Sequence, residues 1–166
     1  MKESIQNFVK YVSVGGFVIS VITVVILYYQ VSLMNEDFNF AHRPWLGVED
    51  VLITKSDQPR FIIKNYGTLP NTQSKIMVSW NAEPLTRDVL IKNGNFLSGN
   101  IIMPNSDFAV TASIPHQKIQ DARNGTSLYI GIIINYEYGN KKSEYGAVLK
   151  YFGKDRFQFI DTWVKE

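Results

Sequence analysis

The sequence contains no cysteine and only two histidines in its 166 residues. Without cysteine, the chain forms no disulfide, no thiolate metal site, no cysteine nucleophile and no lipid-modified cysteine. His42 and His116 are far apart in the sequence, and two histidines do not make a histidine-rich zinc or copper site within one chain. We therefore expect no metal site, and we interpret both histidines as solvated surface residues.

The sequence also lacks the short motifs of the common enzyme classes. It has no Gly-x-Ser-x-Gly elbow, phosphate-binding loop or dinucleotide-binding glycine pattern. Glu49-Asp50, or Glu137 with Glu144, could pair in space, but charges on the solvent face of strands explain them better. Residues 35–39 hold several oxygen ligands without the alternating spacing and turn glycine of a calcium loop. We therefore expect no catalytic residue, no cofactor and no enzymatic activity.

No concentrated basic region is present either. The formal net charge is +2 at pH 7, and no basic run from Arg43 onward is longer than Lys141-Lys142. Nucleic-acid-binding domains carry Lys and Arg in a clustered patch or stripe. We therefore expect no nucleic-acid partner.

The sequence does have a long uncharged run near its N-terminus. Between Lys10 and Glu36 no residue carries a charge. As a helix rising about 1.5 Å per residue, this run exceeds the hydrocarbon core of a bilayer, which is about 30 Å thick. Unpaired backbone groups are costly in lipid, so we predict a transmembrane helix over residues 11–34 despite their many β-branched side chains. The lipid bilayer is then the first expected partner.

Two other interpretations of this run are weaker. A buried strand seldom exceeds about ten residues. A cleaved signal peptide has a shorter apolar core and ends in a small-x-small site, whereas Tyr28 and Tyr29 follow directly here. We interpret Tyr28, Tyr29 and Trp45 as aromatic residues at the outer membrane interface, although Trp45 serves equally well as the first core residue of the following domain.

Charges beside the run predict its orientation. Lys2 and Lys10 precede it, and Glu36 and Asp37 follow it. Positive flanks stay on the cytoplasmic side. We therefore expect residues 1–10 in the cytoplasm and the C-terminal part outside, in a protein of the cell membrane.

After a polar connector at residues 35–42, period-two alternation dominates residues 43–166, which is typical of half-buried strands. The pattern predicts a hairpin that turns at Gly139-Asn140. One face of its first strand is apolar or aromatic, with Ile130, Ile132, Ile134, Tyr136 and Tyr138. Further strands are expected around Ile76, Val78 and Trp80, around Phe108, Val110 and Ala112, and at residues 46–53, 60–64, 89–92 and 157–164.

One short helix is expected at residues 116–123, ended by Asn124-Gly125. Asn124-Gly125-Thr126 is also an N-glycosylation acceptor pattern, with a plain turn as the alternative. About seven or eight short strands without a long amphipathic helix in this part predict the fold class. We expect a mainly β protein, in which the transmembrane helix is followed by an antiparallel immunoglobulin-like β-sandwich.

Three segments follow the apolar run in order: HRPWLGVEDV, FIIKNYGTLPNTQSKIMVSW and LYIGIIINYEYGNKKSEYGAVLKYF. They resemble a loose group of small prokaryotic membrane-anchored proteins with an Arg-Pro/Ala-aromatic first strand, an Asn-x-Gly-x-x-Pro turn and a closing Tyr-x-acid-x-x-Gly hairpin. Here the hairpin glycine, Gly139, comes one position early. The resemblance implies the fold and the membrane topology, and it implies no particular activity. For Asn65 and Gly67 we expect turn conformations that other residues avoid.

These observations favour a non-enzymatic envelope protein whose sandwich is a protein-interaction module or an accessory subunit of a membrane complex, so other membrane or envelope proteins are expected partners. One alternative is a pilin-like or archaellum-like filament subunit, because Gly16-Phe17 resembles a prepilin cleavage point. Val21 then replaces the glutamate usual in bacterial pilins. A carboxylate-based envelope hydrolase is a third alternative.

Overall fold

The computed structural model describes residues 2–166, and it describes their side chains except at residues 2–14, 39, 40 and 98. The chain divides into two compact units, Met1–Ala41 and His42–Glu166. The side chains of Lys2 and Lys10, on which the predicted orientation depends, lie outside the described part.

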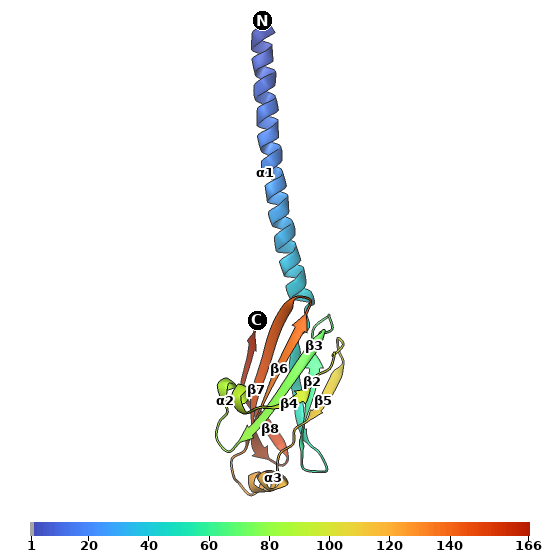
Figure 1. Cartoon of the computed structure of the whole chain (residues 1–166), viewed down its shortest axis with the longest axis vertical. Helices are drawn as coiled ribbons and strands as arrows, with labels where there is room; N and C mark the ends of the chain where they lie inside the picture. Colours follow the sequence, from blue (N-terminus) through green and yellow to red (C-terminus); the bar gives the residue numbers. More distant parts are fainter. Residues whose placement is uncertain (1) are drawn as a thin grey trace. The chain divides into compact units, whose positions relative to one another are not determined.

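The first unit is helical. Helix α1 (Lys2–His42) contains a 24-residue stretch, Gly15–Phe38, that is long and apolar enough to cross a membrane (Figure 1). None of this stretch is buried within the protein. The hydroxyls of Ser20 and Thr23 donate to carbonyl oxygens four residues earlier, at 2.8 and 2.9 Å. These bonds satisfy two polar groups within the helix itself.

The ends of α1 extend beyond the predicted span of residues 11–34. Residues 35–42, which the sequence sets apart as a polar connector, continue the helix to His42. Tyr28 and Tyr29 lie in α1 with 78% and 66% of their surfaces exposed. Their position at a membrane interface stays a prediction.

The second unit contains two antiparallel sheets. The three-stranded sheet has the order β1-β2-β5 and consists of β1 (Leu46–Ile53), β2 (Pro59–Asn65) and β5 (Asp107–Thr111). The five-stranded sheet has the order β4-β3-β6-β7-β8 and consists of β3 (Gln73–Asn81), β4 (Asn95–Ser98), β6 (Tyr129–Tyr138), β7 (Lys141–Gly153) and β8 (Arg156–Lys165).

The chain passes between the sheets three times, from β2 to β3, from β4 to β5 and from β5 to β6. This order is that of an immunoglobulin-like sandwich, with β8 added at the edge beside β7. The predicted fold class, a mainly β chain with an N-terminal apolar helix followed by an antiparallel sandwich, is confirmed. The predicted hairpin is also confirmed, because β6 pairs with β7 across Gly139-Asn140.

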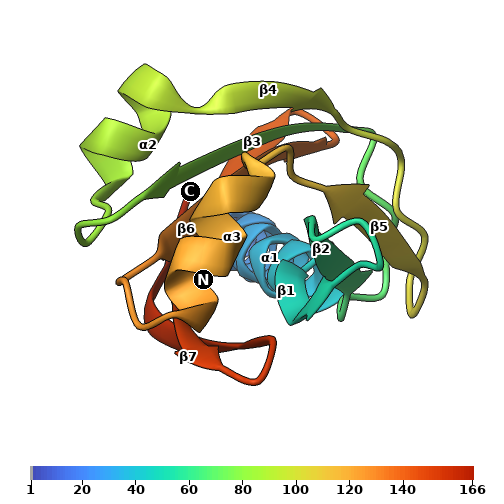
Figure 2. The same ribbon diagram turned by 90° about the horizontal axis from the view of Figure 1, so that it is seen from below.

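The core lies between the inner faces of the two sheets. Phe61 and Ile63 of β2 face Ile132 and Ile134 of β6 across this core, and all four are fully buried. The period-two alternation in the sequence therefore correctly identifies the inward-facing residues of β3 and β6. Helix α3 (His116–Arg123) covers one end of the sandwich with Ile119 and Ala122, which belong to the same core (Figure 2). This helix has the predicted bounds.

One predicted strand is wrong. Residues 89–92 belong to a helix, α2 (Arg87–Asn93), which is followed by β4. A short apolar run such as Val89-Leu90-Ile91 has no periodicity that separates a strand from a helix. Its conformation is set by packing instead, because Leu90 lies directly over Gly131 of β6, where a larger residue would collide with it.

Candidate functional site

The outer face of the five-stranded sheet has a covered half and an open half. Strand register places its outward side chains in rows across β3, β6, β7 and β8. Two rows are covered by α2, and their buried cluster comprises Leu85, Leu90, Ile133 and Val148. The two open rows are polar: Gln73, Glu137 and Lys142 form the first, and Lys75, Asn135, Glu144 and Lys165 form the second.

A groove of about 370 Å³ lies over the two polar rows. Its walls come from all four strands, so residues distant in the sequence meet there. The residues that line it are Gln73, Ser74, Lys75, Asn135, Tyr136, Glu137, Lys142, Ser143, Glu144, Lys165 and Glu166. We call this the polar groove.

At the boundary between the covered and open halves, Glu144 accepts three hydrogen bonds. Arg87 at the start of α2 binds both of its carboxylate oxygens, at 2.6 and 2.8 Å. The indole N–H of Trp163 in β8 donates to the same carboxylate at 2.8 Å. The hydrogen bonds from Arg87, and secondarily the one from Trp163, hold the pKa of Glu144 below its ordinary value. This group joins α2, β7 and β8.

We expect Glu144→Gln to destabilise the domain by about 1–3 kcal/mol at pH 7, because a hydrogen bond to a charged group contributes about that much. The lowered pKa of Glu144 means that its contribution is present above the pKa of the unfolded chain and is lost as the pH falls through the lower folded pKa. The difference between wild type and variant should therefore shrink below about pH 4.5.

Urea unfolding followed by circular dichroism, repeated from pH 7 to pH 3, measures this difference. Glu137→Gln is the matched control, because Glu137 pairs at 3.3 Å with Lys142, whose side chain is 82% exposed. Exposed pairs of this kind contribute little. A deficit for Glu144→Gln that stays constant over the whole pH range would contradict this role of the carboxylate.

The acidic and basic side chains of the polar groove differ in whether they form ion pairs. Its acidic groups have basic partners, because Glu137 pairs with Lys142, Glu144 pairs with Arg87 and Glu166 pairs with Arg43. Among the side chains that the structure describes, Lys75 and Lys165 form no ion pair. The groove therefore offers two ammonium groups, together with the carboxamides of Gln73 and Asn135, to a ligand with carboxylate or other acceptor groups.

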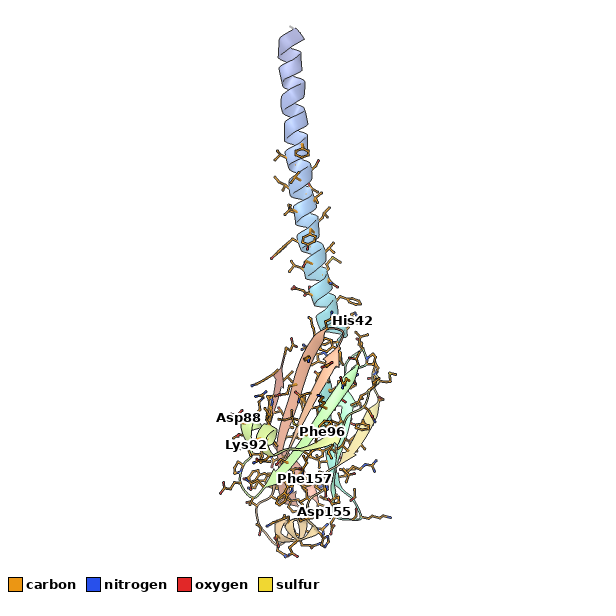
Figure 3. The ribbon with its side chains drawn as sticks, in the orientation of Figure 1. His42, Asp88, Lys92, Phe96, Asp155 and Phe157 are labelled. Atoms are coloured by element: carbon orange, nitrogen blue, oxygen red, sulfur yellow. The ribbon has the colours of Figure 1, made fainter. Side chains whose placement is uncertain are left out.

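A second polar cluster lies at the end of the sandwich near Asp155, away from His42 (Figure 3). Arg123 of α3 donates to Asp57 at 2.8 Å and to Asp155 at 2.9 Å, and His116 lies 3.0 Å from Asp57. The hydrogen bond from Arg123 is the main reason why the pKa of Asp57 is below its ordinary value. Asp57 and Asp155 both have positive φ angles, 55° and 56°. The cluster thus joins two strained turns to α3.

The carboxylates considered in the sequence bind basic partners or backbone. Glu49 pairs with Lys64 at 2.9 Å, and Asp50 accepts a hydrogen bond from the next backbone N–H at 2.7 Å. Glu137 and Glu144 share the polar groove but bind different cations, as described above. Within the described residues, no group of three or more His, Asp or Glu side chains could hold a metal ion.

The other residues singled out in the sequence lie apart from the polar groove. Trp45 is half-buried directly before β1, with the guanidinium of Arg43 3.6 Å from its ring centroid. Asn124 is exposed and ends α3, and Gly125 after it has a φ of 100°. His42 lies 3.2 Å from the hydroxyl of Thr68. The interfacial role of Trp45 and the glycosylation of Asn124 both stay predictions.

The polar groove is not indicated by the sequence alone. The alternation in Gln73 to Lys75 and in Asn135 to Glu137 does indicate which side chains face away from the core. The order in which the strands pair was not available from that alternation. No protein-family model matches the chain, and no curated protein matches it in sequence.

Proposed function

We propose that the protein is a single-pass membrane protein whose sandwich domain is a non-enzymatic interaction module, either on its own or as an accessory subunit of a membrane complex. Helix α1 supports the anchor, because its 24-residue apolar stretch leaves side chains such as Ile19, Val24 and Leu27 more than half exposed. Burying such side chains contributes about 1.5–3 kcal/mol each. Lipid is the environment that covers a helix that is apolar on all sides.

The charges beside the apolar run support an orientation with residues 1–10 in the cytoplasm and the sandwich outside. Lys2 and Lys10 precede the run, whereas Glu36 and Asp37 follow it. Lys and Arg near the end of a span favour the cytoplasmic side.

The polar groove is the observation that carries the interaction role. It combines two ammonium groups without an ion pair, Lys75 and Lys165, with carboxylates that are already bound to Arg or Lys. Such a surface favours an acidic segment of another protein, because the partner's carboxylates would bind the two lysines, whereas the nearby acids Glu137 and Glu144 are already paired with Lys142 and Arg87. We therefore propose an acidic segment of a membrane or envelope protein as the ligand of the groove.

Site-specific photo-crosslinking in the native membrane tests this role. A photoreactive residue at position 73 or 135 should give one discrete adduct with another protein. The matched control is position 60, because Arg60 is exposed on the outer face of the opposite sheet. The substitutions Lys75→Glu and Lys165→Glu should together abolish the adduct, since they reverse the charge of the groove.

Three outcomes would contradict the proposal. These are the absence of an adduct from the groove, an equal adduct from position 60, and an adduct that the charge reversal does not change. A series of adducts at multiples of the chain's own mass would instead indicate the filament alternative.

A further inference from the structure

Two loops of the sandwich lie beside the residue at which α1 ends. The first, residues 66–72, joins β2 to β3. His42 contacts it through its ring nitrogen, 3.2 Å from the hydroxyl of Thr68. Gly67 packs directly against the backbone of Arg43 and Trp45, so closely that a Cβ atom at this position would overlap them. This loop is therefore fixed to residues 42–45, the first residues of the sandwich unit.

The second loop, residues 99–106, joins β4 to β5 and is bonded to the first. The side chain of Asn65 donates to the carbonyl oxygens of Leu69 and Ile102, at 2.8 and 3.0 Å. The side chain of Asn71 accepts from the N–H of Ile102 at 2.6 Å and donates to the carbonyl of Asn100 at 3.1 Å. Both asparagines are fully buried. The two loops thus form one rigid unit.

Large apolar side chains on this unit point into solvent. Ile101 is 59% exposed, Met103 is 57% exposed and Leu69 is 43% exposed. Ile102 between the first two is buried, so it is the alternation around Ile102 that turns Ile101 and Met103 outward. We call Leu69, Ile101 and Met103 the apolar loop cluster. Exposed apolar side chains gathered on one surface are typical of sites that bind another protein or a membrane.

Basic residues lie at the same end of the sandwich. The backbone N–H of Thr72, at the end of the first loop, donates at 2.8 Å to the carbonyl of Glu137 near the β6–β7 turn. Lys141 and Lys142 follow that turn and are exposed. An apolar cluster with lysines beside it is the combination found on surfaces that bind the interface of anionic membranes.

The length of chain between the apolar stretch and the sandwich is short. Gly15–Phe38 ends four residues before His42, which is about 6 Å along a helix and at most about 14 Å in a fully extended chain. Arg43, the next residue, is already buried in the domain. If α1 spans a bilayer, the loops beside His42 are held within this short reach of its surface.

From these observations we infer that the apolar loop cluster inserts into the interface of the same bilayer that α1 crosses, with Lys141 and Lys142 near lipid phosphates. The inference rests on the proposed membrane anchor and goes beyond it. It makes the membrane a second binding surface for the domain, which would hold the polar groove at a defined height and orientation.

Fluorescent probes on single cysteines test the inference. The native chain has no cysteine, so each variant carries one probe site. The full chain is reconstituted in vesicles of phosphatidylethanolamine and phosphatidylglycerol, with or without nitroxide-labelled lipid, and an environment-sensitive probe is attached to Ile101→Cys. Phe152→Cys is the matched control, because Phe152 is 74% exposed and lies near Asp155, at the other end of the domain. Ile22→Cys reports on the anchor.

We expect blue-shifted emission and strong quenching by nitroxide lipid at positions 22 and 101, and neither effect at position 152. Quenching at position 22 without quenching at position 101 would overturn the inference and leave the anchor intact. No quenching at position 22 would overturn the anchor itself. A blue shift at position 101 without lipid quenching would indicate a protein contact, and equal quenching at positions 101 and 152 would indicate nonspecific adsorption. Both results would overturn the inference.

Discussion

Asn65→Ala should destabilise the sandwich by about 3–5 kcal/mol, since leaving buried donors and acceptors without partners costs about 1–3 kcal/mol each. The Asn65 side chain makes four hydrogen bonds. Its oxygen accepts from the backbone N–H of Trp45 at 3.1 Å and of Gly67 at 2.9 Å, and its nitrogen donates to two carbonyls. This one carboxamide therefore joins the residue before β1, the β2–β3 loop and the β4–β5 loop.

Asn71→Ala is the comparison variant, because Asn71 is equally buried but makes two hydrogen bonds of this kind. We expect about half the loss for Asn71→Ala. Asn93→Ala, at an exposed position, should stay within about 0.5 kcal/mol of wild type.

The measurement is urea unfolding of the full chain in detergent micelles, followed by tryptophan fluorescence. All three tryptophans, Trp45, Trp80 and Trp163, belong to the sandwich, so the signal reports on that unit alone. An Asn65→Ala variant as stable as Asn93→Ala would refute the role assigned to this side chain.

Asn65 also shows where reasoning from the sequence succeeds and where it stops. The Asn-x-Gly-x-x-Pro pattern correctly indicates a structural turn. The expected reason was a turn conformation that other residues avoid, and for both Asn65 and Gly67 this reason is wrong. Asn65 is the last residue of β2, and its φ angle is not positive. Gly67 is absent from the positive-φ glycines, which are Gly125, Gly139 and Gly153 among the described residues. Glycine is required at position 67 because the backbone of Arg43 and Trp45 approaches it closely, a contact across more than twenty residues.

Most strands were predictable because their alternation is local. Residues 46–53 form β1, and the predicted segments 60–64 and 157–164 lie within β2 and β8. In β2 the buried side chains repeat every second residue, so the pattern itself indicates which face is buried. In β1 and β8 a register shift interrupts this repeat. Helix α2 was not predictable in this way, because Leu90 is buried by a contact with Gly131 that only the folded sheet supplies.

The polar groove was not predictable for a related reason. Glu137 lies between Tyr136 and Tyr138, so the sequence indicates that it faces outward, whereas Lys142 lies between Lys141 and Ser143 and has no such apolar neighbours. Lys75 alternates with Ile76 alone. Whether they share one surface depends on β3 pairing with β6 and β6 pairing with β7, which are long-range contacts. The ion pair of Arg87 with Glu144 joins residues 57 positions apart, and no local sequence pattern predicts it.

The proposed topology places residues 1–10 and the sandwich on opposite sides of a membrane, and the labelling that it predicts is all or none. A charged residue at the centre of a spanning helix makes the free energy of membrane insertion less favourable by about 2.5–3.5 kcal/mol. Gly15–Phe38 avoids this cost, because its only two charged residues, Glu36 and Asp37, lie near its end. The absence of native cysteine allows each side to be labelled separately. Glu3→Cys reports on the N-terminal side, and Lys118→Cys reports on the exposed surface of α3.

The most direct measurement is the labelling of these two variants with a membrane-impermeant maleimide, first in intact spheroplasts and then after permeabilisation. We predict that Lys118→Cys is labelled in both conditions and that Glu3→Cys is labelled only after permeabilisation, with the protein resistant to carbonate extraction throughout. Labelling of Glu3→Cys but not Lys118→Cys in intact spheroplasts would contradict the orientation. Release of the protein by carbonate would contradict the anchor itself.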